Sequence, residues 1–361
     1  MKHIICFHLF NDYSGSPKVL KMVLEGLLKK GYRVDLASSK GGVLDELLHY
    51  KNLRKHSYPY RFSNNSVITM LRYSAVQVYT FLLAFRWLFH KDVVFYINTL
   101  LPVGPALAGR IMGKYVVYHY HENAFIKGGF YKVLAAFMQR LAHEIICVSD
   151  YQAAFLQRKK NVKIVPNALP KDFVNRLIPN PQTAFERKQI LMLGSLKLYK
   201  SPLEFIELAE RLPQFIFVLV INDTKENIDI FIKEHQINVC KNLTIYPRQN
   251  DVVPFYNQAS LILNLSDKNQ VVETFGLTVL EAMSAGLPVI VPTEGGIAEM
   301  VADGENGYKI DVQELDRIAD AIQNILSDKA LYNRLSTNAL QYSKQFNAAN
   351  MTEQISQLIT H

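Results

Sequence analysis

Short apolar runs alternate with amphipathic helical stretches along almost the whole chain of 361 residues. This alternation predicts parallel sheets, because two parallel strands must be joined by a long crossover that is usually a helix. The runs that we predict as strands are 4–9, 33–38, 92–98, 115–120, 144–149 and 163–165 in the first half, and 189–193, 215–221, 243–246, 261–265 and 289–291 in the second. Helices are predicted at 18–30, 70–89, 131–141, 203–212 and 276–285, and in the tail from 331 to 361.

The segment from Pro166 to Lys188 interrupts this alternation. It is rich in proline and asparagine and has little periodicity, so we interpret it as a linker between domains. A chain of this length also suits two hydrophobic cores better than one. We therefore predict an α/β fold with two tandem Rossmann-like domains. The first comprises residues 1–175 with a C-terminal helix, 342–361, that crosses back to it, and the second comprises residues 176–341.

The chain carries a formal net charge of +8 and has a pI of about 9.1. Such a charge indicates an anionic partner. Zinc-finger spacing, a basic helix and an RNA-binding aromatic signature are all missing from the sequence, so we expect no nucleic-acid partner. An anionic membrane surface and a phosphate-bearing substrate remain open, and the charge does not choose between them.

Three widely spaced cysteines, Cys6, Cys147 and Cys240, are typical of reduced thiols in a cytoplasmic protein. The first apolar run is broken at His8, so we predict no signal peptide. The stretch from Tyr73 to Phe89 is the most apolar, but it contains Gln77 and Arg86, and we predict no transmembrane helix. We expect its aromatic side chains in the core, with part of this face a candidate for contact with lipid or a lipid-linked acceptor.

The strongest functional signal is a loop and helix that carry Glu273 and Glu281. The helix begins near Gly276 and stops at Gly286, so the amides of Gly276, Leu277 and Thr278 have no partner within the helix. Such amides bind phosphate or dense hydroxyl groups, and a carboxylate ahead of them accepts hydrogen bonds from sugar hydroxyls. Glu281 is placed for a second set of diols. An acidic first turn followed by one solvated glutamate explains the spacing equally well.

A second candidate site follows the strand 189–193 and runs from Gly194 to Ser201. It differs from a phosphate-binding P-loop because Tyr199 stands where that loop needs its second glycine. The tyrosine at this position argues against a P-loop nucleoside triphosphatase. Lys197 and Lys200 could still meet a phosphate group, or they could be two solvated lysines.

Two histidines, His119 and His121, alternate with tyrosines at the end of the strand 115–120. They could share one face of the sheet, but no third ligand is identifiable, and we predict no metal. A buried, hydrogen-bonded histidine is the usual alternative. In the loop 11–17, Gly15 is a candidate for close approach to a ligand, and a structural turn is nearly as good an explanation.

The segment Glu273-x7-Glu281, with Phe275-Gly276-Leu277 inside it, resembles the signature of glycosyltransferase family four. The likeness continues through Gly286-Leu287-Pro288, Gly295-Gly296-x-x-Glu299 and Asp303-Gly304-x-Asn306-Gly307, and it covers essentially the whole chain. The resemblance implies the GT-B fold, in which two Rossmann-like domains face each other across a cleft. It also implies that Glu273 and the donor-binding residues after it, Thr274, Phe275, Gly276, Leu277 and Thr278, contact the donor sugar and diphosphate, and that Glu281 holds the ribose.

The resemblance assigns the diphosphate-neutralising lysine to Lys200, in a loop that begins at Gly194. Ser195 stands in place of the family arginine and Ser201 in place of the glycine after the lysine. We expect Lys197 or Arg248 to supply part of the positive charge that this arginine would provide. The family also has a histidine that faces the donor, and His121 fits this position. Ser149 and Pro166-Asn167 match further positions with little specificity.

The resemblance therefore implies a retaining, metal-independent glycosyltransferase in which His121, Lys200 and Glu273 are the catalytic residues. The expected reaction moves a hexose or N-acetylhexosamine from a nucleotide-diphosphate sugar, with UDP favoured over GDP, to a glycan or polyprenyl-linked acceptor in surface polysaccharide synthesis. The donor is a co-substrate, and no cofactor is expected. We expect a cytoplasmic protein and leave open a peripheral attachment to the inner face of the membrane. The alternatives are a nucleotide-sugar epimerase and an inactive nucleotide-sugar-binding partner subunit.

Overall fold

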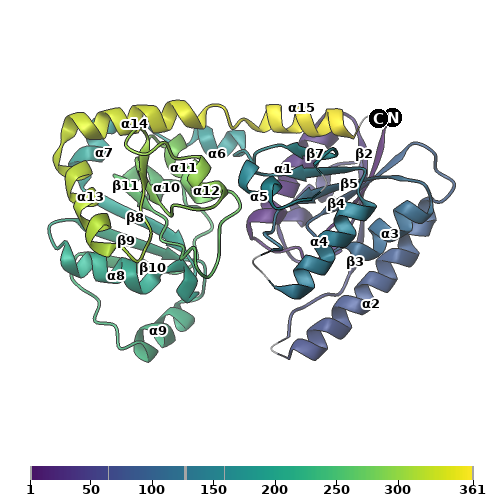
Figure 1. The fold of residues 1–361 in the computed structure, drawn as a ribbon, viewed down its shortest axis with the longest axis horizontal. Helices are drawn as coiled ribbons and strands as arrows, with labels where there is room; N and C mark the ends of the chain where they lie inside the picture. Colours follow the sequence, from purple (N-terminus) through teal and green to yellow (C-terminus); the bar gives the residue numbers. More distant parts are fainter. Residues whose placement is uncertain (1, 64, 126–127, 158, 360–361) are drawn as a thin grey trace. The chain divides into compact units, whose positions relative to one another are not determined.

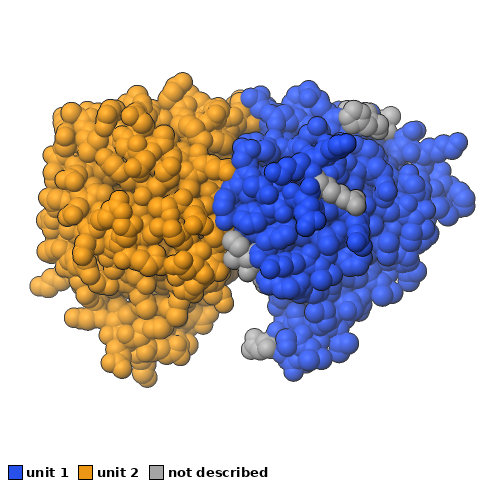
Figure 2. All heavy atoms as spheres, in the orientation of Figure 1, with its two compact units in different colours: residues 1–168, 348–361 blue, residues 169–347 orange. Residues whose placement is uncertain are grey.

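The computed structural model describes residues 2–63, 65–125, 128–157 and 159–359. The chain divides into two compact units, which Figure 2 distinguishes by colour. Unit 1 comprises residues 1–168 and 348–361, and unit 2 comprises residues 169–347. The division therefore lies a few residues before the expected boundary at 175 and a few residues after the expected boundary at 341.

Unit 1 contains a parallel sheet in which the strand order is β3-β2-β1-β4-β5-β6-β7. Its strands are β1 (His3–Phe7), β2 (Arg33–Ser39), β3 (Leu53–Tyr58), β4 (Val93–Asn98), β5 (Tyr115–Tyr120), β6 (Glu144–Cys147) and β7 (Val162–Ile164). Its helices are α1 (Gly15–Lys29), η1 (Val43–His49), α2 (Ser66–Ala84), η2 (Phe85–Trp87), α3 (Val103–Ile111), α4 (Gly129–Leu141), α5 (Asp150–Ala154) and α15 (Ala348–Leu358). Figure 1 shows helices on both faces of this sheet, as in a Rossmann-like domain.

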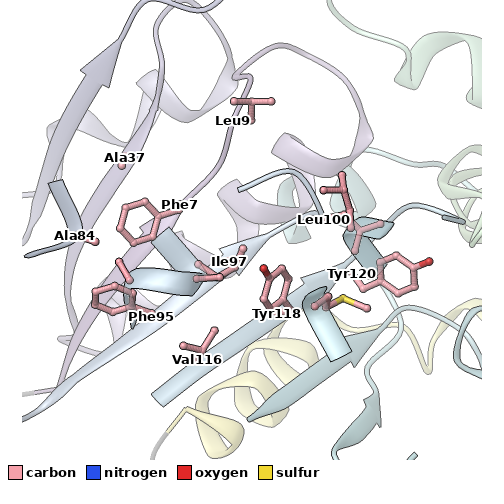
Figure 3. Close-up of a cluster of buried hydrophobic side chains, with 14 of the residues drawn as sticks. Phe7, Leu9, Ala37, Ala84, Phe95, Ile97, Leu100, Val116, Tyr118 and Tyr120 are labelled. Carbon is pink, nitrogen blue, oxygen red and sulfur yellow. The ribbon is translucent and has the colours of Figure 1, made fainter. Parts of the chain in front are cut away.

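Alternate residues of the central strands fill the core between the sheet and α2, α3 and α4 (Figure 3). The rings of Phe7 and Phe95 lie 5.5 Å apart on the neighbouring strands β1 and β4. Ile97, Val116 and Tyr118 extend this cluster, and all of them are fully buried. The strands are apolar on both faces because helices cover both sides of the sheet.

The C-terminal helix α15 belongs to unit 1, as predicted, and it packs on α1. Thr352 lies so close to α1 that a Cβ on Gly26 would be 2.5 Å from it. The hydroxyls of Tyr32 and Ser356 share a hydrogen bond of 2.9 Å, and Lys30 forms an ion pair with Glu353.

Unit 2 contains a second parallel sheet in which the strand order is β10-β9-β8-β11-β12-β13. Its strands are β8 (Gln189–Gly194), β9 (Ile216–Ile221), β10 (Leu243–Tyr246), β11 (Leu261–Leu263), β12 (Val289–Val291) and β13 (Gly307–Lys309). Its helices are α6 (Lys171–Asn175), α7 (Pro181–Arg187), η3 (Leu198–Lys200), α8 (Pro202–Arg211), α9 (Lys225–Glu234), α10 (Val253–Gln258), α11 (Leu277–Ser284), α12 (Gly296–Glu299), α13 (Leu315–Ser327) and α14 (Lys329–Ser343). The direction of winding reverses between β8 and β11, and that switch point is where open α/β sheets bind ligands.

The boundary between the two units lies at 168/169, inside the segment 166–188 that we interpreted as a linker, but residues 169–188 belong to unit 2 and contain the short helices α6 and α7. The side chain of Asn180 caps α7 by accepting a hydrogen bond of 3.1 Å from the amide of Thr183, and Pro181 occupies the first turn. Strands β3 and β13 and helix α3 were also missed. Strand β3 has the sequence LRKHSY and lies at a sheet edge, where polar side chains are tolerated and the apolar signal is weak.

Candidate functional site

The loops that follow β8 and β11 bring three polar side chains of unit 2 together at the switch point. Lys200, in η3, forms an ion pair with Glu273, which lies in the loop between β11 and α11. The Nζ of Lys200 also donates to the Ser266 hydroxyl over 3.3 Å, and that hydroxyl donates to Glu273 over the same distance. The side chains of Lys200 and Glu273 are each about one quarter exposed. The pair is therefore accessible and lies at the edge of the sheet where a ligand is expected.

Glu273 is held in place by the backbone that follows β12. Its carbonyl accepts a hydrogen bond of 2.9 Å from the amide of Gly296. A Cβ on Gly295 would lie 2.5 Å from the same carbonyl oxygen, and Gly295 has a φ of +107°. Close approach and a positive φ both require glycine here, so the GG pair of the sequence motif positions the loop that carries Glu273.

The N-terminus of α11 follows Glu273 directly. Gly276 precedes the helix with a φ of +104°, and a Cβ there would lie 2.6 Å from Ile297. The carbonyl of Gly276 accepts from the amides of Val279 and Leu280. Leu277 and Thr278 are the first two residues of the helix, so their amides have no acceptor within it. The loop thus presents helix amides with the positive end of the dipole beside Lys200 and Glu273.

Not every residue of this motif offers a side chain to a ligand. The ring of Phe275 is buried and packs against Phe346, with ring centroids 5.8 Å apart. Thr274 and Leu277 are half-buried. Phe275 therefore contributes to the core of unit 2, and only its backbone is suited to contact a donor.

Glu281 lies one turn further along α11 and is oriented by a buried tyrosine that the sequence did not indicate. The hydroxyl of Tyr256, on α10, donates to Glu281 over 2.5 Å. Burial, and then the Glu281 carboxylate, raise the pKa of Tyr256 well above its usual value. Tyr256 therefore stays protonated and remains a donor, which fixes one carboxylate oxygen of Glu281.

The remaining predicted residues of unit 2 lie around the end of β8. Asn222 connects Gly194 and Arg248. Its backbone amide donates to the carbonyl of Gly194 over 2.9 Å, and its side-chain oxygen accepts from the guanidinium group of Arg248 over 2.8 Å. Lys197 is exposed and Ser195 is half-buried in the loop after Gly194. The structure thus places Arg248 beside the end of β8.

Gly194 is not required by the fold. Its φ is not positive, and the nearest neighbour of an added Cβ would be Lys200 at 4.0 Å. A glycine that neither backbone conformation nor packing demands leaves open space beside Lys200, which is the arrangement that close approach of a ligand needs.

In unit 1, His121 follows β5 and belongs to a chain of hydrogen bonds. Its Nε2 lies 3.0 Å from the side-chain oxygen of Asn98, and the Asn98 amide nitrogen lies 3.0 Å from Nδ1 of His8. The other nitrogen of His8, Nε2, lies 2.9 Å from the carbonyl of Phe10. Neither His8 nor Asn98 was predicted as a site residue, although His8 lies near the end of the predicted strand 4–9 and Asn98 ends the predicted strand 92–98.

The carbonyl of Phe10 fixes the position of each proton along this row of hydrogen bonds, because a carbonyl can only accept. Nε2 of neutral His8 must carry the proton, so its Nδ1 accepts from the Asn98 amide group. The Asn98 oxygen then accepts, and Nε2 of His121 must donate. His121 therefore has its proton on Nε2, and its Nδ1 is a hydrogen-bond acceptor.

Burial keeps these histidines uncharged. It lowers the pKa of His8 to about 4 and that of His119 to about 3. Burial, followed by repulsion from His119 and His8, lowers the pKa of His121 well below its usual value. The rings of His119 and His121 lie 4.1 Å apart, so the two residues do share one face, as predicted. Among the described residues, no group of three or more histidine, cysteine or acidic side chains is arranged to hold a metal.

Two other features complete the description of the predicted residues and of the cavities. Gly15 is the first residue of α1 and has no positive φ, so its backbone does not require glycine. A cavity in unit 2 is lined by Asn180, by Arg187 of α7 and by Tyr256 and Asn257 of α10, and none of the residues predicted from sequence lines it.

Comparisons with known proteins match both halves of the chain. A family model described as Glycosyl transferases group 1 matches residues 175–342, and one described as Glycosyltransferase Family 4 matches residues 13–173. An uncharacterized glycosyltransferase of Haemophilus influenzae is 22% identical over 354 residues, which cover 94% of each chain. The N-acetyl-alpha-D-glucosaminyl L-malate synthase of Bacillus anthracis is 30% identical over 122 residues, which are 34% of this chain and 31% of that protein.

Solved structures resemble the chain over its full length. The Anabaena protein HepE, crystallised in complex with UDP and glucose, has a TM-score of 0.80 and 19% identity, and the match covers 100% of both chains. At this identity the likeness shows the fold, which is GT-B.

Proposed function

Because the chain belongs to glycosyltransferase family four, we propose that it transfers a hexose or N-acetylhexosamine from a UDP-sugar to a glycan or lipid-linked glycan, with retention of anomeric configuration. The observation that carries this proposal is the group formed by Lys200, Ser266 and Glu273 beside the N-terminus of α11. It combines a cation and helix amides, which suit a diphosphate, with a carboxylate, which suits sugar hydroxyls.

Lys200 and the amides of Leu277 and Thr278 stabilise the negative charge that builds on the leaving diphosphate. This electrostatic contribution is commonly the largest in such reactions, and it needs no metal ion if the cation and amides are already in place. Arg248 adds charge at the β8 end, where Ser195 replaces the family arginine. Glu273 accepts hydrogen bonds from the sugar hydroxyls. Glu281, fixed by Tyr256, holds the ribose diol.

The reaction proceeds on one face of the sugar. The bond between the anomeric carbon and the diphosphate oxygen breaks, the acceptor oxygen bonds to the same carbon, and the acceptor proton passes to the departing phosphate oxygen. His121 is neutral, so we assign it no role as a general acid. The two glutamates have binding roles, so we propose no covalent intermediate of the glycosidase type.

Uridine is proposed as the base because the structurally similar Anabaena protein was crystallised with UDP and with UDP-glucose. Surface polysaccharide synthesis is proposed as the setting, with the acceptor carried on a polyprenyl lipid. The proposal for the acceptor is supported by the apolar surface of unit 1 described below.

A panel of nucleotide sugars should identify the donor by thermal shift. A ligand that binds only the folded protein at 100 times its Kd stabilises it by about 2.7 kcal/mol, so the preferred UDP-hexose or UDP-N-acetylhexosamine should raise the Tm by several degrees. EDTA should leave this shift unchanged. ADP-glucose is the matched control and should give a much smaller shift. Equal shifts with ADP- and UDP-sugars, or none with any UDP-sugar, would contradict the proposed donor.

A further inference from the structure

Helix α2 presents an apolar face to solvent. Val67, Leu71, Val78 and Leu82 recur at helical spacing along one side, and Leu71 is 66% exposed and Leu82 63% exposed. The opposite side, with Val76, Thr80 and Ala84, is buried against the domain. Just beyond the helix, Phe89 is 91% exposed. Large aliphatic side chains in a continuous exposed row are unusual on a soluble domain and mark an interaction surface.

The apolar face continues onto the neighbouring helices. Helix α3 packs against α2, and α4 packs against α3, as Figure 1 also shows. Leu107 and Ile111 are exposed on α3, and Phe130, Val133 and Phe137 are exposed on α4. The ring of Tyr73 on α2 contacts that of Phe130, with centroids 5.8 Å apart. We call these exposed residues of α2, α3 and α4, together with Phe89, the apolar surface.

By length and composition alone, residues 66–87 could cross a membrane, with a mean hydropathy of 1.3 and 17% of the window buried. The contacts of α2 favour a different arrangement. The amide of Gly104 donates to Gln77 over 2.9 Å, and a Cβ on Gly104 would lie 2.3 Å from the carbonyl of Gln77. Tyr73 donates to the carbonyl of Leu101 over 2.8 Å. A helix packed this closely against the domain is suited to lie in the membrane interface rather than to span it.

The charge of this region determines which partner fits. Residues 47–143 contain twelve lysines and arginines but only two acidic residues, Asp92 and Glu122. The segment therefore has a net charge of +10, which exceeds the +8 of the whole chain. Arg61, Arg72 and Arg86 are exposed next to the apolar side chains of α2. Apolar side chains bordered by basic ones match a surface with anionic headgroups over hydrocarbon.

We propose that the apolar surface of unit 1 docks the protein on an anionic lipid bilayer, with α2 lying in the interface and the bordering arginines against the headgroups. The proposal does not depend on the proposed reaction, because it concerns a surface of unit 1 and can be measured without a donor. A second copy of the chain is the competing occupant, but two such surfaces would bring two strongly basic regions together, which like-charge repulsion opposes.

The test is sedimentation of the full-length protein with vesicles of phosphatidylglycerol and phosphatidylcholine. The wild type should bind these vesicles, bind phosphatidylcholine alone at least about tenfold more weakly, and lose affinity as salt is raised. A Leu71→Ser/Val78→Ser/Leu82→Ser variant should bind at least about tenfold more weakly, because three exposed apolar side chains no longer reach the hydrocarbon. Ile178→Ser is the matched control, since Ile178 is 70% exposed but belongs to unit 2.

An Arg72→Gln/Arg86→Gln variant tests the charge separately and leaves the apolar side chains intact. It should reduce binding to anionic vesicles and leave the weak binding to neutral ones unchanged. Light scattering of the same proteins reports any self-association. Absence of vesicle binding by the folded wild type would overturn the proposal, and so would a dimer that the triple serine variant dissociates while vesicle binding persists. Equal losses in Ile178→Ser would also overturn it.

Discussion

Replacing Lys200 by alanine should lower kcat with the preferred UDP-sugar roughly 100- to 1000-fold, the range seen when one preorganised donor to a developing negative charge is removed. Lys200 is the cation that the structure places beside Glu273 and the amides of α11. Its charge acts on the leaving diphosphate, so the loss should appear in kcat more than in KM. The measurement is release of UDP at saturating donor.

Lys197→Ala is the matched control, because Lys197 belongs to the same loop but is exposed. We expect it to change kcat less than about tenfold, since the charge of a solvated lysine is screened. Glu273→Gln separates two contributions of the ion pair. It keeps the side-chain shape but removes the negative charge, and should weaken sugar binding while Lys200 remains. Equal losses in Lys197→Ala and Lys200→Ala would show that the assignment of Lys200 is wrong.

Unit 1 should become less stable as the pH falls from 7 to 5. In the folded state the pKa of His8 is about 4 and that of His119 about 3, whereas an unfolded histidine titrates near 6.5. Between these values the unfolded chain binds more protons, so protonation favours unfolding and stability is lost as the pH falls. At pH 5 each of these two histidines lowers the free energy of unfolding by about 2 kcal/mol. The lowered pKa of His121 acts in the same direction.

Trp87 provides a local readout, because it is the single tryptophan of the chain and is buried in unit 1. Urea unfolding followed by its fluorescence should give a lower free energy of unfolding at pH 5 than at pH 7. His119→Asn should reduce that difference, and His235→Asn, which removes an exposed histidine of unit 2, should not. Asp35 does not affect this comparison. Burial opposes ionisation of its carboxyl group, but hydrogen bonds from His3 and His56 outweigh burial and lower its pKa, so the stability that it contributes is lost only below about pH 3.8. A pH-independent free energy of unfolding would contradict the neutral state of these histidines.

The fold was largely predictable from sequence because the buried strands are continuous apolar runs. Strands 115–120, 243–246 and 289–291 were predicted with the bounds that the structure has. Elements whose signal is not apolar were missed. Strand β3 has charged residues at the sheet edge, α3 includes Gly104 and Pro105, and α7 is indicated only by its cap at Asn180 and by Pro181.

The site was predictable where a local motif carried it. Glu273, Gly276, Glu281 and the GG pair are close in sequence, and the structure brings Lys200 to Glu273 from another loop. The supporting residues Ser266, Tyr256 and Asn98 were missed. Each acts through a contact with a residue distant in sequence, which no local pattern reveals. Asn98 ends a predicted strand next to the one that carries His121, so its place at the ends of neighbouring parallel strands was the available signal.

The most direct test of the proposed function is NMR observation of the sugar after incubation of the protein with UDP-hexoses and UDP-N-acetylhexosamines, in EDTA, with and without oligosaccharide or polyprenyl-linked acceptors. We predict that UDP is released, that an acceptor accelerates this release, and that the product keeps the anomeric configuration of the donor. An inverted product would contradict retention. A sugar isomerised without acceptor would indicate an epimerase, and tight donor binding without turnover would indicate an inactive partner subunit, and either result would contradict the proposed transferase.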